Sequence, residues 1–488
     1  MPAAGVLIAG TSSDAGKSLV VTGLCRLLAR RGVRVAPFKA QNMSNNSAVC
    51  ADGSEIGRAQ YLQAQAAGVT ASALLNPVLL KPGTDRRAFV VVRGRPAGML
   101  EAGEYATGRA HLAAAAFGAY EELRDAVDLI VCEGAGSPAE INLRAGDYVN
   151  LGLARRFGLP VSVVGDIDRG GVFAALYGTH QLLAAEDRAL ITSFVINKFR
   201  GDRGVLEPGL AELTRRTGVR FAGVLPWLPG LWLDGEDALT LGRWRAGSGA
   251  ADEPPAGDRL RVAVIALPRM SNATDVDALA AEPGVDVLVT EDPAAVWSAH
   301  LAVLPGTRST AGDLTWLRRA GLATVLARRA IRDAPVLGIC GGFQMLGTAI
   351  CDRVESDAGE IAGLGLLPVR TRFAAEKTLG RPRGWWRGHP VEAYEIHHGV
   401  AELDEGDGDE AFLDGVRRGA VFGTMWHGVL ENDGFRRAWL TEVAARAGAG
   451  WRPEPGAPAF AARRETMIDA LADLLERELD LDLVLGAR

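Results

Sequence analysis

The 488-residue sequence is poor in cysteine, in aromatic side chains and in long apolar runs. Its five cysteines contain no Cys-x-x-Cys pair, which argues against a disulfide framework and favours reduced thiols in a cytosolic enzyme. No apolar run reaches about 18 residues without a charge, and no basic leader with an apolar core stands at the N-terminus. We therefore expect a cytoplasmic protein without a membrane partner. A net charge of −6 gives no reason to expect nucleic acid as a partner either.

The most specific local pattern follows the apolar run 6–9 and precedes a helical stretch over 19–29. It reads Gly10-Thr11-Ser12-Ser13-Asp14-Ala15-Gly16-Lys17-Ser18. Such a loop lets successive backbone N–H groups converge on phosphate oxygens, while the lysine adds a cation and the serine offers a hydroxyl to Mg²⁺. Five residues, not the usual four, separate Gly10 from Gly16-Lys17. The pattern predicts ATP bound by Gly10, Thr11, Gly16, Lys17 and Ser18; a tight Gly-rich turn without a ligand is the alternative.

Four polar clusters, 37–47, 133–142, 166–171 and 197–202, lie where strands are expected to end, the last three after predicted strands at 129–132, 161–164 and 194–196. Apolar runs that alternate with helical stretches indicate a parallel α/β sheet, whose ligands bind beyond the carboxyl ends of the strands. Asn197 is a further expected ATP-binding residue at such an end. Taken alone, a carboxylate there is often a helix cap or a solvated charge, but four clusters in succession favour a Mg²⁺ site. The expected Mg²⁺ ligands are Ser18, Glu133, Asp166 and Asp168.

A stretch rich in Pro, Gly and Ala divides the chain. It predicts a linker over 243–258 between an ATP-binding synthetase domain, 1–242, and a second α/β domain, 259–446. Strands are expected there at 262–266, 285–289, 301–304, 336–339 and 420–425. The remaining tail, 447–488, contains a helical pattern over 461–479 that we expect to dock on a domain face.

The second domain contains a candidate nucleophile, Cys340, in Gly338-Ile339-Cys340-Gly341-Gly342-Phe343-Gln344. A cysteine between glycines, after a strand and before a helix expected over 344–350, is typical of a nucleophile elbow, where the helix N-terminus favours the thiolate. Gly341 and Gly306, which also follows a strand, are candidate oxyanion donors. A buried structural cysteine is the alternative.

A cysteine nucleophile needs a base, and seven histidines are available. His427 stands out because it follows an expected strand and precedes Gly428, a loop position that can face a neighbouring strand end. His397 and His398 are the next candidates. The sequence leaves open which histidine meets Cys340.

Six motifs in a shared order, spanning about residues 5–435, resemble the cobyric acid synthase family of glutamine-dependent amidotransferases in cobalamin biosynthesis. The motifs are 38–44, 133–140, 166–173, 338–347, 394–399 and 426–428. The resemblance implies a P-loop parallel-sheet domain similar to dethiobiotin synthetase, joined to a class I glutamine amidotransferase α/β domain. It also implies a ligase that amidates the b, d, e and g carboxylates of adenosylcobyrinic acid a,c-diamide, consuming ATP and L-glutamine with Mg²⁺.

Within that resemblance, Lys39 is expected near the γ-phosphate and Cys340 is expected to form a thioester and release ammonia. Ammonia must be shielded from water, so a channel or closed interface between the domains is expected. The position two residues after His427, commonly acidic in class I glutaminases, is Val429. We therefore expect a Cys340–His427 dyad with slow glutaminase turnover until ATP and the corrinoid bind, with Glu395 or Glu431 as possible substitutes for the missing acid.

Three rival functions remain. The first is the sister enzyme that amidates the a and c carboxylates, against which Phe38-Lys39-Ala40-Gln41-Asn42-Met43 argues. The second is an amidotransferase acting on another carboxylate, such as one of the cell wall. The third belongs to a different class, a P-loop switch ATPase whose second domain only binds. The sequence does not identify the corrinoid contacts or the oligomeric state.

Overall fold

The computed structural model describes residues 4–83, 87–101, 109–228, 259–404 and 409–486. The chain divides into two compact units. Unit 1 comprises Met1–Ser44, Cys50–Leu233 and Arg464–Arg488, and unit 2 comprises Asn45–Val49 and Asp234–Arg463. The expected linker, 243–258, and the expected end of the first domain at 242 lie outside the described residues.

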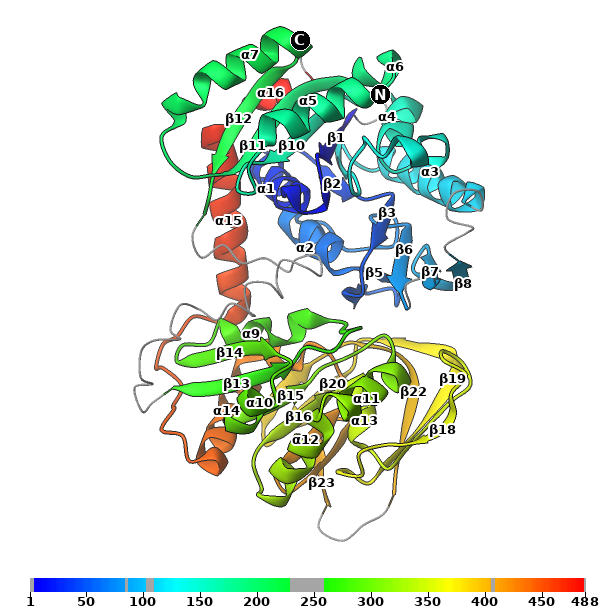
Figure 1. The fold of residues 1–488 in the computed structure, drawn as a ribbon, viewed down its shortest axis with the longest axis vertical. Coiled ribbons are helices and arrows are strands. Elements are labelled where there is room, and N and C mark those ends of the chain that lie inside the picture. Colours follow the sequence, from blue (N-terminus) through cyan, green and yellow to red (C-terminus); the bar gives the residue numbers. More distant parts are fainter. Residues whose placement is uncertain (1–3, 84–86, 102–108, 229–258, 405–408, 487–488) are drawn as a thin grey trace. The chain divides into compact units, whose positions relative to one another are not determined.

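Unit 1 is built on a six-stranded parallel sheet with the strand order β12-β11-β10-β1-β9-β2 (Figure 1). β1 is central: Leu7 pairs with Val161 of β10 on one side and with Cys132 of β9 on the other. This order brings the ends of β1, β9 and β10 to one edge of the sheet. The strands are β1 Ala4–Gly10, β2 Val35–Phe38, β9 Leu129–Glu133, β10 Val161–Asp166, β11 Ile191–Phe199 and β12 Arg220–Pro226.

Each face of this sheet has its own apolar core. Val6 and Ile8 belong to one core and Leu7 and Ala9 to the other, as the alternation of side chains along a strand requires. Both faces are therefore covered, which explains why the strands read as continuous apolar runs. The helices of unit 1 are α1 Lys17–Arg30, α2 Arg58–Ala67, α3 Ala110–Arg124, α4 Leu151–Phe157, α5 Val172–Leu182, α6 Ala185–Arg188 and α7 Glu207–Thr217.

The C-terminal helix α15 (Phe460–Glu478) and the short α16 (Leu481–Val484) complete the core beside α1. Ile468, Ala472 and Leu475 are buried in that core with Leu24 of α1. Ion pairs flank the apolar contact, such as Arg30 with Asp473 at 2.6 Å and Arg31 with Glu476 at 2.9 Å. The tail thus covers one face of the unit 1 sheet from Arg464 onward.

Unit 1 also contains a smaller sheet and short 3-10 turns. A four-stranded sheet has the order β3-β6-β7-β8. Its strands are β3 Gln41–Met43, β6 Val78–Pro82, β7 Arg87–Val92 and β8 Arg95–Glu101, with β5 Glu55–Gly57 nearby in sequence; 3-10 turns are η1 Ser13–Ala15, η3 Ile141–Gly146 and η4 Arg203–Val205.

Unit 2 contains a seven-stranded sheet with the order β14-β13-β15-β16-β25-β24-β23. The first five strands are parallel, and β24 and β23 continue the sheet antiparallel. The strands are β13 Leu260–Ile265, β14 Val285–Thr290, β15 Leu301–Leu304, β16 Val336–Ile339, β23 Asp409–Phe412, β24 Gly415–Arg418 and β25 Val421–Thr424. Helices and turns between them are η5 Ala273–Val276, α9 Asp277–Ala280, α10 Pro293–Ser298, α11 Thr310–Arg319, α12 Leu322–Ile331, α13 Gly341–Leu346, η6 Val429–Glu431 and α14 Asp433–Ala447.

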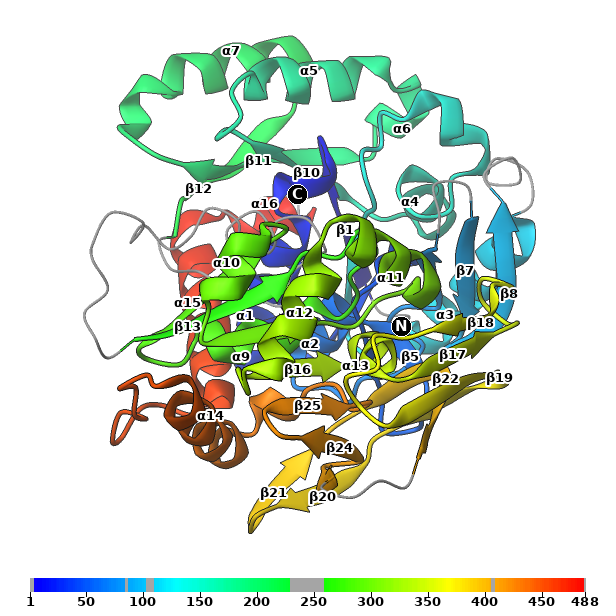
Figure 2. The same ribbon diagram turned by 60° about the horizontal axis from the view of Figure 1, so that its bottom comes forward.

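A second sheet of unit 2 has the order β18-β17-β19-β22 (Figure 2). Its strands are β17 Ala349–Asp352, β18 Gly359–Ala362, β19 Val369–Gly380 and β22 Glu395–Leu403; β20 Arg383–Trp386 and β21 His389–Glu392 form a hairpin, and β4 is Ser47–Val49. The expected helix over 344–350 is wrong at both ends. α13 begins directly after Cys340 and ends before Gly347, where the backbone becomes extended (φ −67°, ψ −178°) and the N–H of Thr348 donates to the carbonyl of Val369 at 2.7 Å as the chain enters β17.

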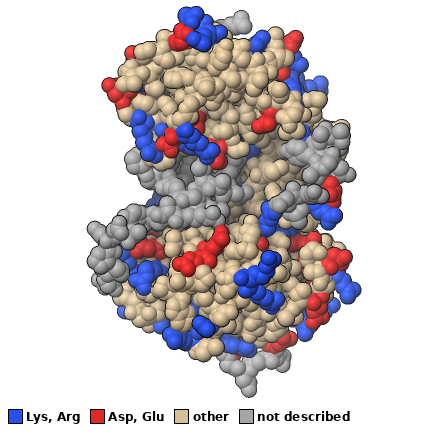
Figure 3. Space-filling view, viewed as in Figure 1, with Lys and Arg blue, Asp and Glu red and all other residues tan. Residues whose placement is uncertain are grey.

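The parallel α/β fold predicted for both domains is confirmed. No helix among the described residues combines the length and apolar character needed to cross a bilayer. On the face drawn in Figure 3, basic and acidic side chains are interspersed over the described surface.

Candidate active sites

The phosphate loop of unit 1 links β1 to α1 through a backbone that only glycine fits at Gly16. Its φ is 100°, and a Cβ there would lie 2.0 Å from Asn197 Nδ2. That amide donates instead to the carbonyl of Ala15 at 3.0 Å, and the N–H of Thr11 donates to the carbonyl of Val164 at 2.9 Å. Asn197, expected to bind ATP, thus braces the loop from β11.

Lys17, the first residue of α1, folds back over the loop. Its Nζ donates to the carbonyls of Ser12 at 2.8 Å, Ser13 at 3.0 Å and Gly136 at 3.2 Å. The ammonium therefore lies between the loop after β1 and the loop after β9, where phosphate oxygens are expected.

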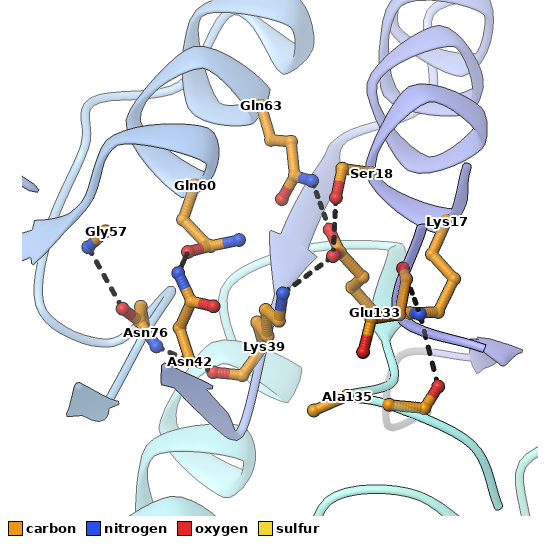
Figure 4. Close-up of polar contacts among 12 residues, drawn as sticks. Lys17, Ser18, Lys39, Asn42, Gly57, Gln60, Gln63, Asn76, Glu133 and Ala135 are labelled. Atoms are coloured by element: carbon orange, nitrogen blue, oxygen red, sulfur yellow. Dashed lines mark hydrogen bonds and ion pairs between the residues drawn. The ribbon is translucent and has the colours of Figure 1, made fainter. Parts of the chain in front are cut away.

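Glu133, at the end of β9, is the centre of a buried polar cluster (Figure 4). Its Oε1 accepts from Ser18 Oγ at 2.7 Å and from Lys39 Nζ at 2.8 Å, and its Oε2 accepts from Gln63 Nε2. Burial raises the pKa of this carboxyl, but the charge of Lys39 and the three hydrogen bonds outweigh it, so the net pKa shift is downward. Glu133 is an anion held in place by one cation and two neutral donors.

Neighbouring amides hold the backbone of Lys39. Asn76 Nδ2 donates to the Lys39 carbonyl at 3.1 Å, while Asn76 Oδ1 accepts from the N–H of Gly57 at 3.0 Å (Figure 4). Gln63 was missed by the sequence analysis. In the structure Gln60 and Gln63 are as fully buried as the apolar residues of α2, a property that the sequence alone does not display.

The four expected Mg²⁺ ligands fall into two pairs. Ser18 and Glu133 are hydrogen-bonded, whereas Asp166 accepts from the backbone N–H of Asp168 at 2.9 Å and pairs with Lys198 at 2.6 Å. Asp168 itself lies 3.5 Å from Arg200. Among the described residues, no three His, Cys, Asp or Glu side chains gather as a metal cage. A hydroxyl and a carboxylate oxygen still fit Mg²⁺, which takes few protein ligands and completes its shell with phosphate and water.

In unit 2, Cys340 lies at the sharp turn between β16 and α13. It is one of the few non-glycine residues with positive φ, 50° with ψ −109°, and its side chain is largely buried. Gly342 permits the turn, because a Cβ there would lie 1.9 Å from the carbonyl of Leu304. Such a strained backbone at a cysteine matches the expected nucleophile elbow.

The two expected oxyanion donors lie beside this cysteine. Gly341 is the first residue of α13, so its N–H has no acceptor within the helix. A Cβ on Gly341 would meet the Thr307 backbone nitrogen at 3.1 Å, and a Cβ on Gly306 would meet His427 Cε1 at 3.0 Å. The turn after β15 and the start of α13 therefore approach each other next to the histidine.

The histidine is oriented by an acid that the sequence analysis did not identify. Asp275 Oδ2 lies 2.6 Å from His427 Nδ1, and Asp275 Oδ1 accepts from the N–H of Gly428 at 2.8 Å. Burial lowers the pKa of His427, but the charges of Asp275 and Cys340 and its hydrogen bonds to both raise the pKa overall, to about 10. The interactions with Cys340 and Asp275 place His427 between the thiol and the carboxylate.

Tyr394 supports the other side of this histidine. The two rings stack with centroids 5.3 Å apart, and the two residues exchange backbone hydrogen bonds of 2.9 and 3.1 Å. His427 is thus held by a carboxylate in its plane and an aromatic ring on its face.

The expectation that Cys340 and His427 form a dyad without an acid is therefore wrong, because Asp275 contacts His427. Glu395, one proposed substitute, lies 3.1 Å from His397 instead, and His398 Nδ1 lies 3.0 Å from the Ala374 carbonyl. Asp275 stands 152 positions from His427 in the chain. Asp275 lies in η5, well beyond the end of β13 at Ile265, so no local pattern in the sequence links it to His427.

Comparisons with known proteins match a domain family to each half of the chain. Residues 6–240 match the CobQ/CobB/MinD/ParA nucleotide binding domain, and residues 261–435 match the CobB/CobQ-like glutamine amidotransferase domain. A cobyric acid synthase of Cutibacterium acnes is 62% identical over 484 residues, covering 99% of each chain. The chain belongs to the cobyric acid synthase family.

Further relatives of this family are similar over their full lengths. The cobyric acid synthase of Streptomyces avermitilis is 58% identical, covering 98% of this chain and 95% of that one, and the relative in Mycolicibacterium gilvum is 56% identical, covering 99% and 96%. A crystal structure of a glutamine amidotransferase matches 38% of this chain and 99% of its own with 18% identity and a TM-score of 0.32. The resemblance to the cobyric acid synthase family is confirmed.

Proposed function

We propose that the chain is an ATP- and glutamine-dependent amidoligase that converts adenosylcobyrinic acid a,c-diamide to adenosylcobyric acid by amidating its b, d, e and g carboxylates. Full-length identity to relatives named cobyric acid synthase supports this reaction. The observation that carries it is the coexistence of two sites in one chain, a phosphate loop beside Glu133 and a Cys340–His427–Asp275 array.

In the activating half, a substrate carboxylate oxygen attacks the γ-phosphorus of ATP, the bond to the β-phosphate oxygen breaks, and ADP leaves. The product is an acyl phosphate, whose phosphate departs when ammonia attacks the acyl carbon. Lys17 and Lys39 are the cations of this site, so we assign them to offset charge on the transferring phosphoryl group. Glu133 keeps Lys39 aligned between these steps.

Mg²⁺ fits beside Ser18 and Glu133, and when bound it would neutralise phosphate charge. Asp166, held by Lys198, and Asp168 are assigned a lesser part. Gly10, Thr11 and Gly16 are assigned to the backbone cradle of the phosphates.

In the glutaminase half, Cys340 Sγ attacks the side-chain amide carbon of glutamine. His427 holds the proton that the Cys340–His427 pair shares and gives it to the departing nitrogen, which leaves as ammonia, and water then hydrolyses the thioester to glutamate. Asp275 holds the imidazole in one orientation and stabilises its protonated form. The N–H groups of Gly341 and Gly306 are assigned to the oxyanion of each tetrahedral intermediate.

The decisive experiment supplies ATP, Mg²⁺ and the diamide corrinoid with either glutamine or ammonium, and weighs the product. The unaltered chain should add four amides from either nitrogen source. Cys340→Ala should lose the reaction with glutamine and keep the reaction with ammonium, whereas Lys17→Ala should lose both.

Cys351→Ala, on β17 of the same unit, is the matched control and should behave like the unaltered chain. Retained ammonium-dependent activity in Lys17→Ala would contradict the assignment of the phosphate loop. Two added amides on cobyrinic acid, with none on the diamide, would identify the sister reaction instead.

A further inference from the structure

A five-residue segment, Asn45–Val49, groups with unit 2 although the residues on both sides of it belong to unit 1. We call it the 45–49 segment. It is joined by peptide bonds to Ser44 and Cys50 of unit 1 and follows the Lys39 of the nucleotide site by six positions. Its residues are buried, with Ser47 fully so. The position of this segment in unit 2 is specific, as its polar contacts show.

Two reciprocal hydrogen bonds tie the 45–49 segment to the turn that carries Asp275. The N–H of Ser47 donates to Asn272 Oδ1 at 3.0 Å, and the N–H of Ala273 donates to Asn46 Oδ1 at 3.0 Å. All of these groups are buried, so loss of either partner leaves a polar group without water.

These bonds act on the start of η5. Asn272 precedes η5 with φ 50° and ψ 45°, a left-handed conformation that asparagine tolerates. Its carbonyl accepts from the N–H of Asp275 at 3.0 Å, which closes the turn. Asn46 and Ser47 therefore brace the backbone that aims Asp275 at His427.

The same segment also reaches the second support of His427. Val49 packs in a small buried apolar cluster with Tyr394 and Ile396. Tyr394 stacks on the His427 ring. The 45–49 segment thus contacts two supports of the His427 ring. One is the turn that carries Asp275, and the other is Tyr394.

We propose that Asn46, Ser47 and Val49 are positioning residues of the glutaminase site. The 45–49 segment holds the Asp275 turn and Tyr394 where they orient His427, so glutamine hydrolysis depends on a segment threaded in from the nucleotide-binding part of the chain. Displacing this segment lowers glutaminase turnover without removing any group that touches glutamine. The inference rests on the proposed function, because it presumes glutamine hydrolysis at Cys340.

The test compares Asn46→Ala and Asn272→Gly with the unaltered chain. Asn46→Ala removes the acceptor for Ala273, and Asn272→Gly removes the acceptor for Ser47 while keeping the left-handed backbone. Each should lower kcat for glutamine hydrolysis about 5- to 20-fold with little change in KM, since one buried hydrogen bond is lost. Ammonium-dependent amidation should stay within about twofold.

Ala51→Ser, an exposed position just beyond the segment, is the matched control and should leave both rates unchanged. A sharper test is a double-mutant cycle that combines Asn46→Ala with Asp275→Asn and measures the rate of glutamine hydrolysis. Because Asn46 acts through Asp275, adding Asn46→Ala to Asp275→Asn should cause no further loss in glutaminase rate.

Unchanged kcat in both variants, a loss that adds fully to that of Asp275→Asn, or an equal fall in ammonium-dependent amidation would overturn the inference. An unaltered chain that hydrolyses no glutamine would instead refute the proposed function. The two failures are therefore distinguishable within one set of assays.

Discussion

Each site of this protein is built on a buried carboxylate, Glu133 at the end of β9 in unit 1 and Asp275 in η5 of unit 2, and the two carboxylates differ in what balances their charge. Glu133 in unit 1 faces the ammonium of Lys39 at 2.8 Å with two neutral donors around it. Asp275 in unit 2 faces His427 at 2.6 Å and one backbone N–H. One partner is a lysine, and the other carries its charge only while protonated.

This difference matches what each site must do. A site that binds polyphosphate needs cations held in fixed places, and Glu133 keeps Lys39 in place. A site that moves a proton between sulfur and nitrogen needs a base whose charge changes during the reaction, and Asp275 stabilises the charged form. Each of these two buried carboxylates therefore takes its role from the partner that balances its charge.

The largest effect is expected from Asp275→Asn. The variant keeps the shape but loses the charge and the hydrogen-bond acceptor that orient His427, so kcat for glutamine hydrolysis should fall about 10³- to 10⁴-fold. Ammonium-dependent amidation should persist, as measured by product mass. Glu395→Gln, which alters the partner of His397 only, is the control and should stay within about twofold. A larger loss of glutaminase kcat in Glu395→Gln than in Asp275→Asn would contradict the assignment of Asp275 as the acid that orients His427.

A somewhat smaller effect, on stability, is expected from Lys39→Met. Removing the cation leaves Glu133 buried and unbalanced, which should cost about 3–5 kcal/mol of unfolding free energy in urea titration. Adding Glu133→Gln should restore most of that loss, because a neutral pair needs no counter-charge. Both variants should still amidate about 10²-fold more slowly with either nitrogen source. A double variant as unstable as the single one would show that Glu133 is not balanced by Lys39.

The smallest effect is expected from a change of pH. The contribution of His427 to stability should weaken as the pH rises, whereas that of Glu133 should weaken as the pH falls. The pKa of His427 is raised from 6.5 to about 10, so its contribution to stability is present below pH 6.5 and is lost as the pH rises toward 10. The unfolding free energy lost in Asp275→Asn should therefore shrink by roughly 1–3 kcal/mol between neutral pH and pH 10. The pKa of Glu133 is lowered, so its contribution is present above its ordinary value of 4.5 and is lost only in acid.

Urea titrations of Asp275→Asn and the unaltered chain at several pH values measure this difference. Glu133→Gln with Lys39→Met serves as the second reference, because its deficit should change in acid instead. A deficit of Asp275→Asn that grows with alkaline pH would contradict the ion pair with His427.

Much of the nucleotide site was predictable because its parts are local. Gly16, Lys17 and Ser18 are consecutive, and Glu133 was recognisable as a carboxylate directly after an apolar strand. The glutaminase nucleophile was predictable for the same reason, since Cys340 has its glycines beside it. The sequence singled out His427 because it follows an expected strand and left His397 and His398 as the next candidates; the structure pairs His427 with Cys340 and Asp275.

Other features were not predictable, because they join residues far apart in the chain. Asp275 meets His427 across 152 positions, and Gln63 meets Glu133 across 70. The length of α13 was also missed, because the hydrogen bond from the N–H of Thr348 to the carbonyl of Val369 depends on a strand that follows more than twenty residues later.

The sequence by itself determined two parallel α/β units, the phosphate loop, the cysteine elbow and the family, because each depends on a short pattern or on similarity along the whole chain. Only the tertiary structure decided which acid orients His427, which cation balances Glu133 and which unit the 45–49 segment joins. Those choices depend on which distant segments become neighbours when the chain packs, and that is a property of the whole fold rather than of any local pattern.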